Sequence, residues 1–267
     1  MKIKNSLIIS TYNWPEALEL VLLSVLNQSV LPDEVIIADD GSKGETKSLI
    51  EKFKQKFKIP LHHVWHKDEG FRKSVILNKA ILKAKGVYII QTDGDCILHS
   101  DFVKNHLSYA QKNTYLYGSR VNIQNNFLSV LFNEKQINFN CFSKGIKKRT
   151  RAIYFPILNK LYSSNNKLSK KYRGCNTSYF KTDFIAINGY NEDFNGWGRE
   201  DSEFAIRLHN LGLKAQRLRY QGIVFHIFHN EKSKDQLEIN NSIEHQTKEN
   251  KIVKCKNGYD KYLNAKK

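Results

Sequence analysis

The chain has 267 residues, 40% of them hydrophobic, and its 43 Lys and Arg against 26 Asp and Glu give a formal net charge of +17. No apolar run approaches the roughly 18 residues of a membrane-spanning helix, and the N-terminus lacks the apolar core of a signal peptide, so we expect a cytoplasmic protein. The four cysteines form no CxxC pair and are expected to be free thiols rather than ligands of a zinc knuckle. The charge favours anionic partners such as nucleotide phosphates, nucleic acid or an acidic membrane, with a solvated Lys-rich surface as the alternative.

The first hundred residues alternate between short apolar runs and helical patterns. A helix with Asn13 as its N-cap is predicted to bury residues 18–26, and further helices are predicted over residues 45–57 and 73–84. Gly86 is predicted to be the left-handed C-cap of the last of them. This alternation predicts an α/β fold with a mostly parallel sheet flanked by helices. The strands are predicted at residues 7–10, 35–38, 61–65 and 87–91.

Polar side chains directly follow three of these predicted strands. Thr11 follows the first strand, and Asp39 and Asp40 follow the second. Asp93 and Asp95 flank a glycine after the fourth. Because ligands of parallel sheets bind beyond the carboxyl ends of the strands, these side chains are expected to form one site. The Asp-Gly-Asp pair suits a hard divalent cation that bridges to phosphate oxygens, although Asp and Gly are also common turn residues.

A second acidic cluster opens a predicted helix near residue 200. Glu200 and Asp201 lie in its first turn, where the helix dipole favours acidic residues even without a function. In the functional interpretation, the dipole keeps Asp201 ionised as a general base. Trp197 lies between two glycines, where it either stacks on a sugar ring or closes over a site; packing in the core is the alternative.

Two histidines lie three residues apart near a predicted late strand at residues 222–228. Either His226 or His229 can reach a metal as a neutral imidazole, and a purely structural role is the alternative. Residues 125–171 are rich in Asn, Lys and Ser and are expected to form an irregular insert, which contains the basic run 147–151. The polar, Lys-rich residues after 230 are expected to be helical.

The joint order of these motifs resembles the inverting family 2 glycosyltransferases, which have the GT-A fold. The resemblance runs from about residue 6 to 230 and implies one GT-A-type domain with a Rossmann-like nucleotide-binding half. That half would span residues 1–120, the insert and acceptor half 121–230, and a basic tail 231–267. The first-half motifs are residues 10–13, 39–42, 68–73 and 93–95. Residues 173–176, 188–192 and 196–201 resemble a galactosyltransferase-type C-terminal half.

The resemblance implies a nucleotide-sugar site at the ends of the first strands. Thr11 and either Asp39 or Asp40 would contact the nucleoside. Arg72 would approach the diphosphate, and Asp93 would face the ribose or the metal. The donor implied is a nucleotide-sugar, with UDP as the expected nucleotide.

The same resemblance implies Mn²⁺ or Mg²⁺ as cofactor. Asp95 would bind the metal together with a late histidine, and both His226 and His229 match that position. Asp201 would deprotonate the acceptor hydroxyl. Trp197 would line the acceptor site, where Glu200 is also expected to bind acceptor hydroxyls.

The implied reaction is a single displacement that inverts the anomeric centre and moves a sugar to a hydroxyl of a saccharide or glycolipid acceptor. Synthesis of a surface polysaccharide or lipopolysaccharide is the expected setting. The basic run and tail predict peripheral contact with the anionic inner face of the cell membrane. Two alternatives stay open. A sugar nucleotidyltransferase lacks its expected Gly-rich basic loop here, and a basic nucleic-acid-binding protein lacks a recognisable binding module, so no nucleic acid partner is expected.

Overall fold

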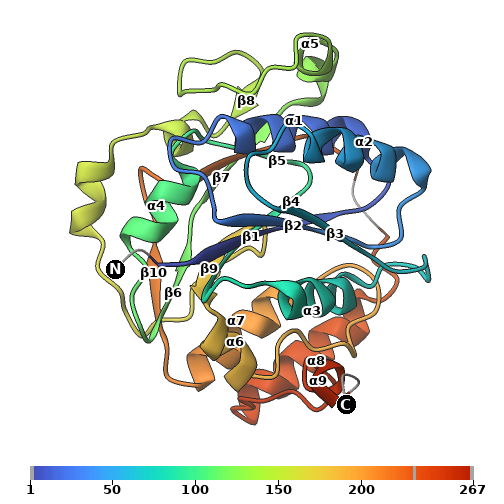
Figure 1. Cartoon of the computed structure of the whole chain (residues 1–267). Helices are drawn as coiled ribbons and strands as arrows, with labels where there is room; N and C mark the ends of the chain where they lie inside the picture. The colour runs from blue at the N-terminus through green and yellow to red at the C-terminus, as the bar shows by residue number, and fades with distance from the viewer. Residues whose placement is uncertain (1–2, 231–232, 265–267) are drawn as a thin grey trace.

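The computed structural model describes residues 3–230 and 233–264, and its central feature is a large sheet between two layers of helices (Figure 1). Within these residues the sheet has seven strands in the order β10-β6-β9-β4-β1-β2-β3. Strand β9 is antiparallel to both of its neighbours, and the other pairs are parallel, which confirms the predicted mostly parallel α/β sheet. The strands are β1 (Asn5–Thr11), β2 (Glu34–Asp39), β3 (Leu61–Trp65), β4 (Tyr88–Asp93), β6 (Thr114–Tyr117), β9 (Asn176–Phe180) and β10 (Lys214–Arg217).

Helices cover both faces of this sheet, with α1, α2 and α4 on one face and α3, α6 and α7 on the other (Figure 1). Alternate residues of a strand enter the two layers: in β1, Leu7 and Ile9 pack with α1, whereas Ile8 packs with α3. Because both faces are covered, every residue of β1 is buried, which explains its continuous apolar run. The helices are α1 (Pro15–Leu26), α2 (Gly44–Lys54), α3 (Lys73–Lys83), α4 (Phe102–Ser108), α6 (Lys181–Ala186) and α7 (Glu200–Asn210).

A second, four-stranded sheet in the order β5-β11-β7-β8 shares an apolar cluster with Ala17 and Leu20 of α1. Strand β11 pairs antiparallel with β5, and this register places His226 opposite Cys96. The pairing brings the late part of the chain beside the turn that follows β4. The strands are β5 (Cys96–Leu98), β7 (Ser119–Ile123), β8 (Ile146–Lys147) and β11 (Ile223–His226).

The insert contains short elements, and the C-terminal residues contain the 13-residue helix α8 and the short helix α9. In the predicted tail, α8 packs against α7, and the ring centroid of Tyr259 lies 5.2 Å from that of Phe184 in the core. The domain boundary at residue 230 stays a prediction, and residues 231–232 and 265–267 of the tail lie outside the described residues. The remaining elements are η1 (Asn125–Phe127), α5 (Leu128–Asn133), η2 (Arg149–Ala152), η3 (Pro156–Leu161), α8 (Leu237–Glu249) and α9 (Lys261–Asn264).

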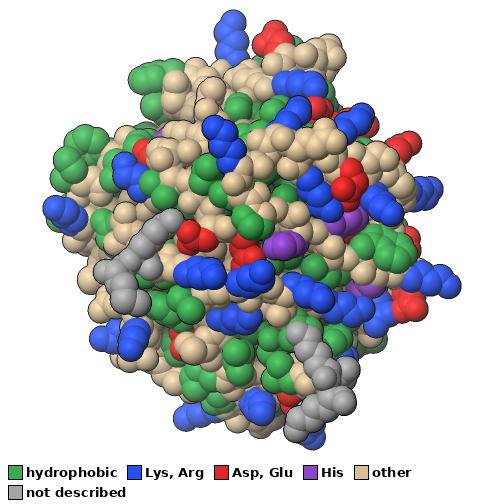
Figure 2. Space-filling model, viewed as in Figure 1, with side chains coloured by type: hydrophobic (Ala, Val, Ile, Leu, Met, Phe, Trp, Pro, Cys, Tyr) green, Lys and Arg blue, Asp and Glu red, His purple; other side chains and the backbone are tan. Residues whose placement is uncertain are grey.

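The basic charge is spread broadly over the surface. Figure 2 shows Lys and Arg side chains across the whole breadth of the visible face, rather than in one patch. Such a distribution is what a solvated, Lys-rich surface gives. Among the described residues, no helix combines the length and the apolar composition that crossing a membrane requires.

The predicted N-cap of the first helix is wrong. Helix α1 begins at Pro15 with Trp14 at the N-cap position. Asn13 has a left-handed φ of 46°, and its Oδ1 accepts a hydrogen bond of 2.9 Å from the backbone N–H of Lys43. The Asn13 side chain therefore ties the loop after β1 to the loop after β2 instead of capping the helix.

The predicted role of Gly86 is also wrong. The C-cap of α3 is Ala84, which has an extended backbone. A Cβ atom at Gly86 would lie 2.5 Å from the backbone carbon of Asn5, well inside van der Waals contact. Glycine at this position therefore permits the close approach of two backbone segments at the start of β1 and β4.

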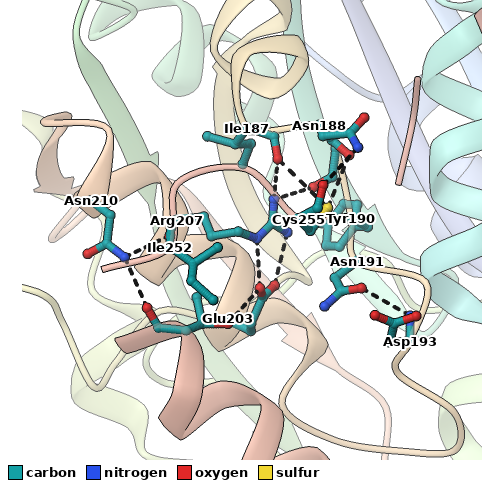
Figure 3. A network of polar contacts seen from close by, with 12 residues as sticks. Ile187, Asn188, Tyr190, Asn191, Asp193, Glu203, Arg207, Asn210, Ile252 and Cys255 are labelled. Atoms are coloured by element: carbon teal, nitrogen blue, oxygen red, sulfur yellow. Dashed lines mark hydrogen bonds and ion pairs between the residues drawn. The ribbon is translucent and has the colours of Figure 1, made fainter. Parts of the chain in front are cut away.

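A buried ion pair fastens α7 to its surroundings (Figure 3). Arg207 is fully buried, and its Nε and Nη2 donate to the two carboxylate oxygens of Glu203 at 2.7 and 2.9 Å. Its Nη1 donates to the backbone carbonyls of Ile187 and Gly189 at 2.6 and 2.7 Å. Thr247 of α8 donates to Glu203 Oε1 at 3.2 Å. The ion pair thus links three parts of the chain, which are helix α7, the loop that follows α6, and helix α8.

We expect Glu203→Ala to lower the free energy of unfolding by about 3–5 kcal/mol, because it leaves the Arg207 charge buried without its partner. Urea unfolding monitored by circular dichroism measures this change. The exposed Glu249 on α8 provides the control, and Glu249→Ala should change stability by less than about 0.5 kcal/mol. Equal effects of the two variants would contradict a structural role for the pair.

Candidate active site

Three side chains of types that can bind a metal converge just after β4. The nearest ligand atoms of Asp95, His226 and His229 all lie within 4.8 Å of one another. Asp95 Oδ2 lies 3.6 Å from His226 Nε2 and 3.5 Å from His229 Nε2. Burial lowers the pKa of His226, with the Asp95 carboxylate opposing this effect, so the ring tends towards the neutral form that a metal ligand requires. The structure therefore brings both predicted histidines to Asp95.

The backbone around Gly94 sets the position of Asp95. The Gly94 N–H donates to the carbonyl of Ser10 at 2.7 Å, and a Cβ atom at Gly94 would lie 3.0 Å from the side chain of Thr11. Glycine therefore lets this turn approach the end of β1. On the other side, the Ile227 N–H donates to the Asp95 carbonyl at 2.8 Å, which fixes the turn against the residue after β11.

Asp93 makes a different set of contacts from Asp95. Its Oδ1 accepts hydrogen bonds from Lys73 Nζ at 2.7 Å and from Ser10 Oγ at 2.6 Å. Burial alone would raise the pKa of Asp93, but the Lys73 ammonium and these hydrogen bonds lower it. Burial alone would likewise lower the pKa of Lys73, yet the carboxylates of Asp93 and Glu200 raise it. Lys73 is therefore a fixed cation among carboxylates, and reasoning from the sequence missed it although it ends the motif at residues 68–73.

The two acidic residues that open α7 have different surroundings. Asp201 accepts backbone hydrogen bonds from Gly174 on Oδ2 at 2.9 Å and from Ser202 on Oδ1 at 2.7 Å. Glu200 is 8% exposed, and its Oε2 has no hydrogen-bond partner in the part of the chain that is described. Burial and repulsion by Asp201 raise the pKa of Glu200 to about 7, although Lys73 opposes this shift. Asp201 is held in a fixed orientation, whereas one carboxylate oxygen of Glu200 is buried without a hydrogen-bond partner among the described residues.

Histidines hold both carboxylates at the end of β2. Asp39 Oδ2 lies 2.8 Å from His63 Nε2, and Asp40 Oδ1 lies 2.7 Å from His66 Nε2. Asp40 Oδ2 also accepts a hydrogen bond of 2.9 Å from the backbone N–H of Arg72. Asp39 is completely buried, whereas Asp40 lines a cavity. Sequence reasoning found neither histidine, because a His in or after a partly exposed edge strand carries no pattern that identifies its partner.

The cavity beside Asp40 has a volume of about 350 Å³. Tyr12, Asp40 and Phe71 line it from the first half of the chain, and Trp197, 41% exposed, lines it from the second. Tyr12 donates a hydrogen bond of 2.8 Å to Asp68. The predicted site residues thus meet from both halves of the chain around this hollow and the adjacent metal-ligand group.

Two other predicted residues lie at the edge of this arrangement. Thr11 is 7% exposed and packs against Gly94. The guanidinium of Arg72 pairs with Glu69, three residues earlier on the same segment. Arg72 therefore has a carboxylate partner within the chain in place of a phosphate.

Comparison with known families decides what kind of protein this is. The sequence pattern described as "Glycosyl transferase family 2" matches residues 6–179, more than half of the chain. The chain belongs to glycosyl transferase family 2. A second pattern, described as "N-terminal domain of galactosyltransferase", matches residues 160–230 of this glycosyltransferase. The resemblance inferred from the motifs is thereby confirmed, including the galactosyltransferase-type second half.

Individual relatives agree with this assignment. The chondroitin synthase of Escherichia coli is 27% identical over 223 residues, which are 78% of this chain and 32% of that protein. The hyaluronan synthase of Pasteurella multocida is 26% identical over 223 residues, or 78% of this chain and 23% of that protein. The family 2 chain thus spans about a third or less of the length of these synthases.

A solved structure confirms the GT-A fold. The mannosyltransferase PcManGT from Pyrobaculum calidifontis, in complex with GDP-Man and Mn²⁺, aligns with a TM-score of 0.60 at 18% identity. The alignment covers 85% of this chain and 57% of that one. At this identity the likeness concerns the fold, and the chemistry has to be argued from the site itself.

Proposed function

We propose that this family 2 glycosyltransferase moves a sugar from a UDP-linked donor to a hydroxyl of a saccharide acceptor, with a divalent metal and with inversion. One observation carries the proposal. A metal-ligand group, Asp95 with His226 and His229, lies at the same edge of the sheet as the acidic pair at residues 200–201, of which Glu200 is buried. Lys73 lies between the two, because it pairs with Asp93 and interacts with both Glu200 and Asp201.

The donor atoms at the metal-ligand group suit Mn²⁺ better than Mg²⁺. Mg²⁺ prefers oxygen ligands in a strict octahedron, whereas a carboxylate with imidazoles suits a transition metal. Asp95, His226 and His229 would hold the ion, which would neutralise charge on the leaving nucleotide diphosphate. The separations of about 3.5 Å from Asp95 Oδ2 to each imidazole are compatible with one ion shared between them.

The nucleoside end of the donor is assigned to the cavity beside Asp40. Asp40 and Tyr12 line that cavity, so Asp40 rather than the buried Asp39 would reach the base or ribose. Thr11 would support the turn at Gly94, and Arg72 would exchange Glu69 for a donor phosphate. Asp93 would keep Lys73 beside the reaction centre rather than bind the metal itself.

The acceptor is assigned to the side of the site formed by α7. Asp201 would take the proton of the attacking hydroxyl, while Glu200 binds a neighbouring hydroxyl and Trp197 stacks on the acceptor sugar. A single displacement assisted by one base, without an enzyme nucleophile, inverts the anomeric centre. The two backbone hydrogen bonds to Asp201 support this role, because they orient its carboxylate before substrate arrives.

The biological setting remains part of the proposal. The relatives named as chondroitin and hyaluronan synthases favour a polysaccharide acceptor, consistent with surface polysaccharide or lipopolysaccharide synthesis. A cytoplasmic location with peripheral contact at the membrane stays a prediction from the basic charge.

A panel of nucleotide sugars tests the donor proposal. With Mn²⁺ present, we expect release of free nucleotide from a UDP-sugar at least ~10-fold faster than from GDP- or ADP-sugars, because buried polar groups discriminate between bases. EDTA should stop this release. Formation of pyrophosphate from UTP and a sugar phosphate would instead indicate a nucleotidyltransferase. Salt-sensitive binding to DNA without any turnover would indicate a nucleic-acid-binding protein.

A further inference from the structure

A second hollow, separate from the cavity beside Asp40, has a strongly basic lining. Its volume is about 450 Å³, and its cationic residues are Arg151, Lys171, Arg217 and Arg219. No Asp or Glu is among the lining residues, while Ile153 and Tyr220 add an apolar and an aromatic surface. It shares no lining residue with the cavity beside Asp40. We call it the basic groove.

Among the described residues, no carboxylate neutralises the charges of the basic groove. In the described part of the chain, none of its four cations forms an ion pair with a carboxylate. The buried Nε of Arg217 has no hydrogen-bond partner there. Burial, together with the charges of Arg219 and Arg151, lowers the pKa of Arg217, which is the effect expected when like charges are gathered without a counter-ion.

Aromatic rings and backbone contacts hold these cations in place. The Arg219 guanidinium lies 5.2 Å from the ring centroid of Tyr162 and 5.1 Å from that of Tyr220. Arg151 Nη1 donates to the carbonyl of Arg120 at 3.2 Å. The Phe155 N–H donates to the carbonyl of Tyr220 at 2.8 Å, which joins the insert to the segment after β10. These contacts join the part of the lining that the insert contributes to the part that follows β10, so the groove is pre-organised.

The basic groove lies close to the proposed reaction centre. Ser119 in its wall pairs with Ile223, which precedes the metal-ligand residue His226 by three positions on β11. Three residues of strand span about 10 Å. Lys171, another lining residue, precedes Gly174 by three positions, and the Gly174 N–H donates to Asp201. A chain that enters the reaction centre can thus extend into the groove.

We propose that the basic groove binds an anionic group of the acceptor saccharide, such as a carboxylate or a phosphate, and so selects acidic acceptors. This inference rests on the proposed glycosyl transfer, which assigns the donor to the cavity beside Asp40. Arginine guanidinium groups match carboxylates and phosphates through paired hydrogen bonds. Tyr220 offers a ring for a sugar face. A concave groove of this size holds a discrete group, whereas a planar lipid surface would need cations on a convex face.

Binding and acceptor selectivity test the proposal. The probe is a short oligo-uronide, with its neutral methyl ester for comparison, titrated into the chain in the presence of UDP and Mn²⁺. We expect the acid to bind at least ~10-fold more tightly than the ester, since one charge-assisted hydrogen bond is sufficient for that ratio. Arg217→Gln and Lys171→Gln should each remove most of the difference. Lys112→Gln deletes the same charge at an exposed position outside the groove and should leave it unchanged.

Each outcome of this experiment is informative. Inorganic phosphate that competes with the oligo-uronide at millimolar concentration would extend the groove's ligands to phosphate groups, and no competition would restrict them to carboxylates. Equal binding of acid and ester by the unaltered chain overturns the proposal. Capture by phosphatidylglycerol vesicles, lost in Arg217→Gln and unmatched by any oligo-uronide binding, would replace the saccharide with a membrane. Hydrolysis of the UDP-sugar by water reports on the donor site separately, so its absence in the unaltered chain would indicate failure of the proposed function instead.

Discussion

Asp95→Ala is expected to reduce sugar transfer by at least ~100-fold and to abolish the Mn²⁺ dependence of UDP binding. The carboxylate is the anionic member of the group it forms with His226 and His229, and it lies within 3.6 Å of both imidazoles. Loss of one group that stabilises transition-state charge reduces turnover by about 10²–10³-fold. Initial rates across a Mn²⁺ titration, together with calorimetric UDP binding with and without Mn²⁺, measure both effects.

The same measurements decide whether His226, His229 or both bind the metal. His226→Ala and His229→Ala should each weaken Mn²⁺-dependent UDP binding if both are ligands, whereas the exposed His245 on α8 gives a matched control. If only one variant weakens binding, the other histidine has a supporting role. Full activity of the unaltered chain in EDTA would refute metal dependence altogether, and the cluster would then be a hydrogen-bonded structural group.

The layers of helices and strands could be predicted from the sequence, but the contacts between distant parts of the chain could not. Strand β1 was predictable because it is buried on both faces and reads as an apolar run. Asn13 and Gly86 misled the prediction because each satisfies a local rule for helix ends. Their contacts are with Lys43 and Asn5, which belong to other elements. Local rules cannot anticipate such partners, since the energy that fixes the residue comes from tertiary packing.

The candidate site was predictable where residues that can bind a metal lie at or directly after the end of a predicted strand. Asp95 and His226 could be proposed as ligands, yet their proximity depends on the pairing of β11 with β5, which spans more than a hundred residues. The sequence alone did not identify the roles of three other residues, Lys73, His63 and His66, because these roles depend on contacts with distant aspartates. Each acts by neutralising or holding an aspartate whose position becomes known only in the folded chain. The raised pKa of Glu200 is likewise a product of burial, which composition does not encode.

Asp201→Asn is expected to lower kcat by about 100-fold or more while UDP-sugar binding is kept, as expected when a general base is lost. The geometry gives the reason for preferring Asp201 to its neighbour. Its two oxygens accept hydrogen bonds from the N–H groups of Gly174 and Ser202, which fix the direction of the carboxylate. Each oxygen keeps a further lone pair for a substrate proton. Single-turnover rates and donor Kd values, measured on the same preparation, separate the two effects.

Glu200→Gln is the matched comparison, and it should raise the acceptor KM with a smaller effect on kcat. Because the pKa of Glu200 is raised to about 7, the side chain is protonated below that pH and ionised above it. By linkage, its contribution to stability is present at acidic pH and is lost as the pH rises through about 7. In the unaltered chain, acceptor KM should therefore change between about pH 6 and 8, and in Glu200→Gln this change should disappear. Urea unfolding between about pH 4.5 and 7, where only the unfolded chain has this group ionised, should lose the corresponding pH dependence in Glu200→Gln.

The pair of variants distinguishes three arrangements of the acidic cluster. A large loss of kcat in Asp201→Asn, with only a KM effect in Glu200→Gln, supports the proposed division of roles. The opposite pattern would make Glu200 the base, since its unpartnered Oε2 and its pKa near neutrality also suit proton transfer. Small effects in both variants would leave these carboxylates as charges that complement the helix N-terminus. In that case Lys73 would neutralise a purely structural cluster, and Lys73→Met would reduce stability without a specific loss of kcat.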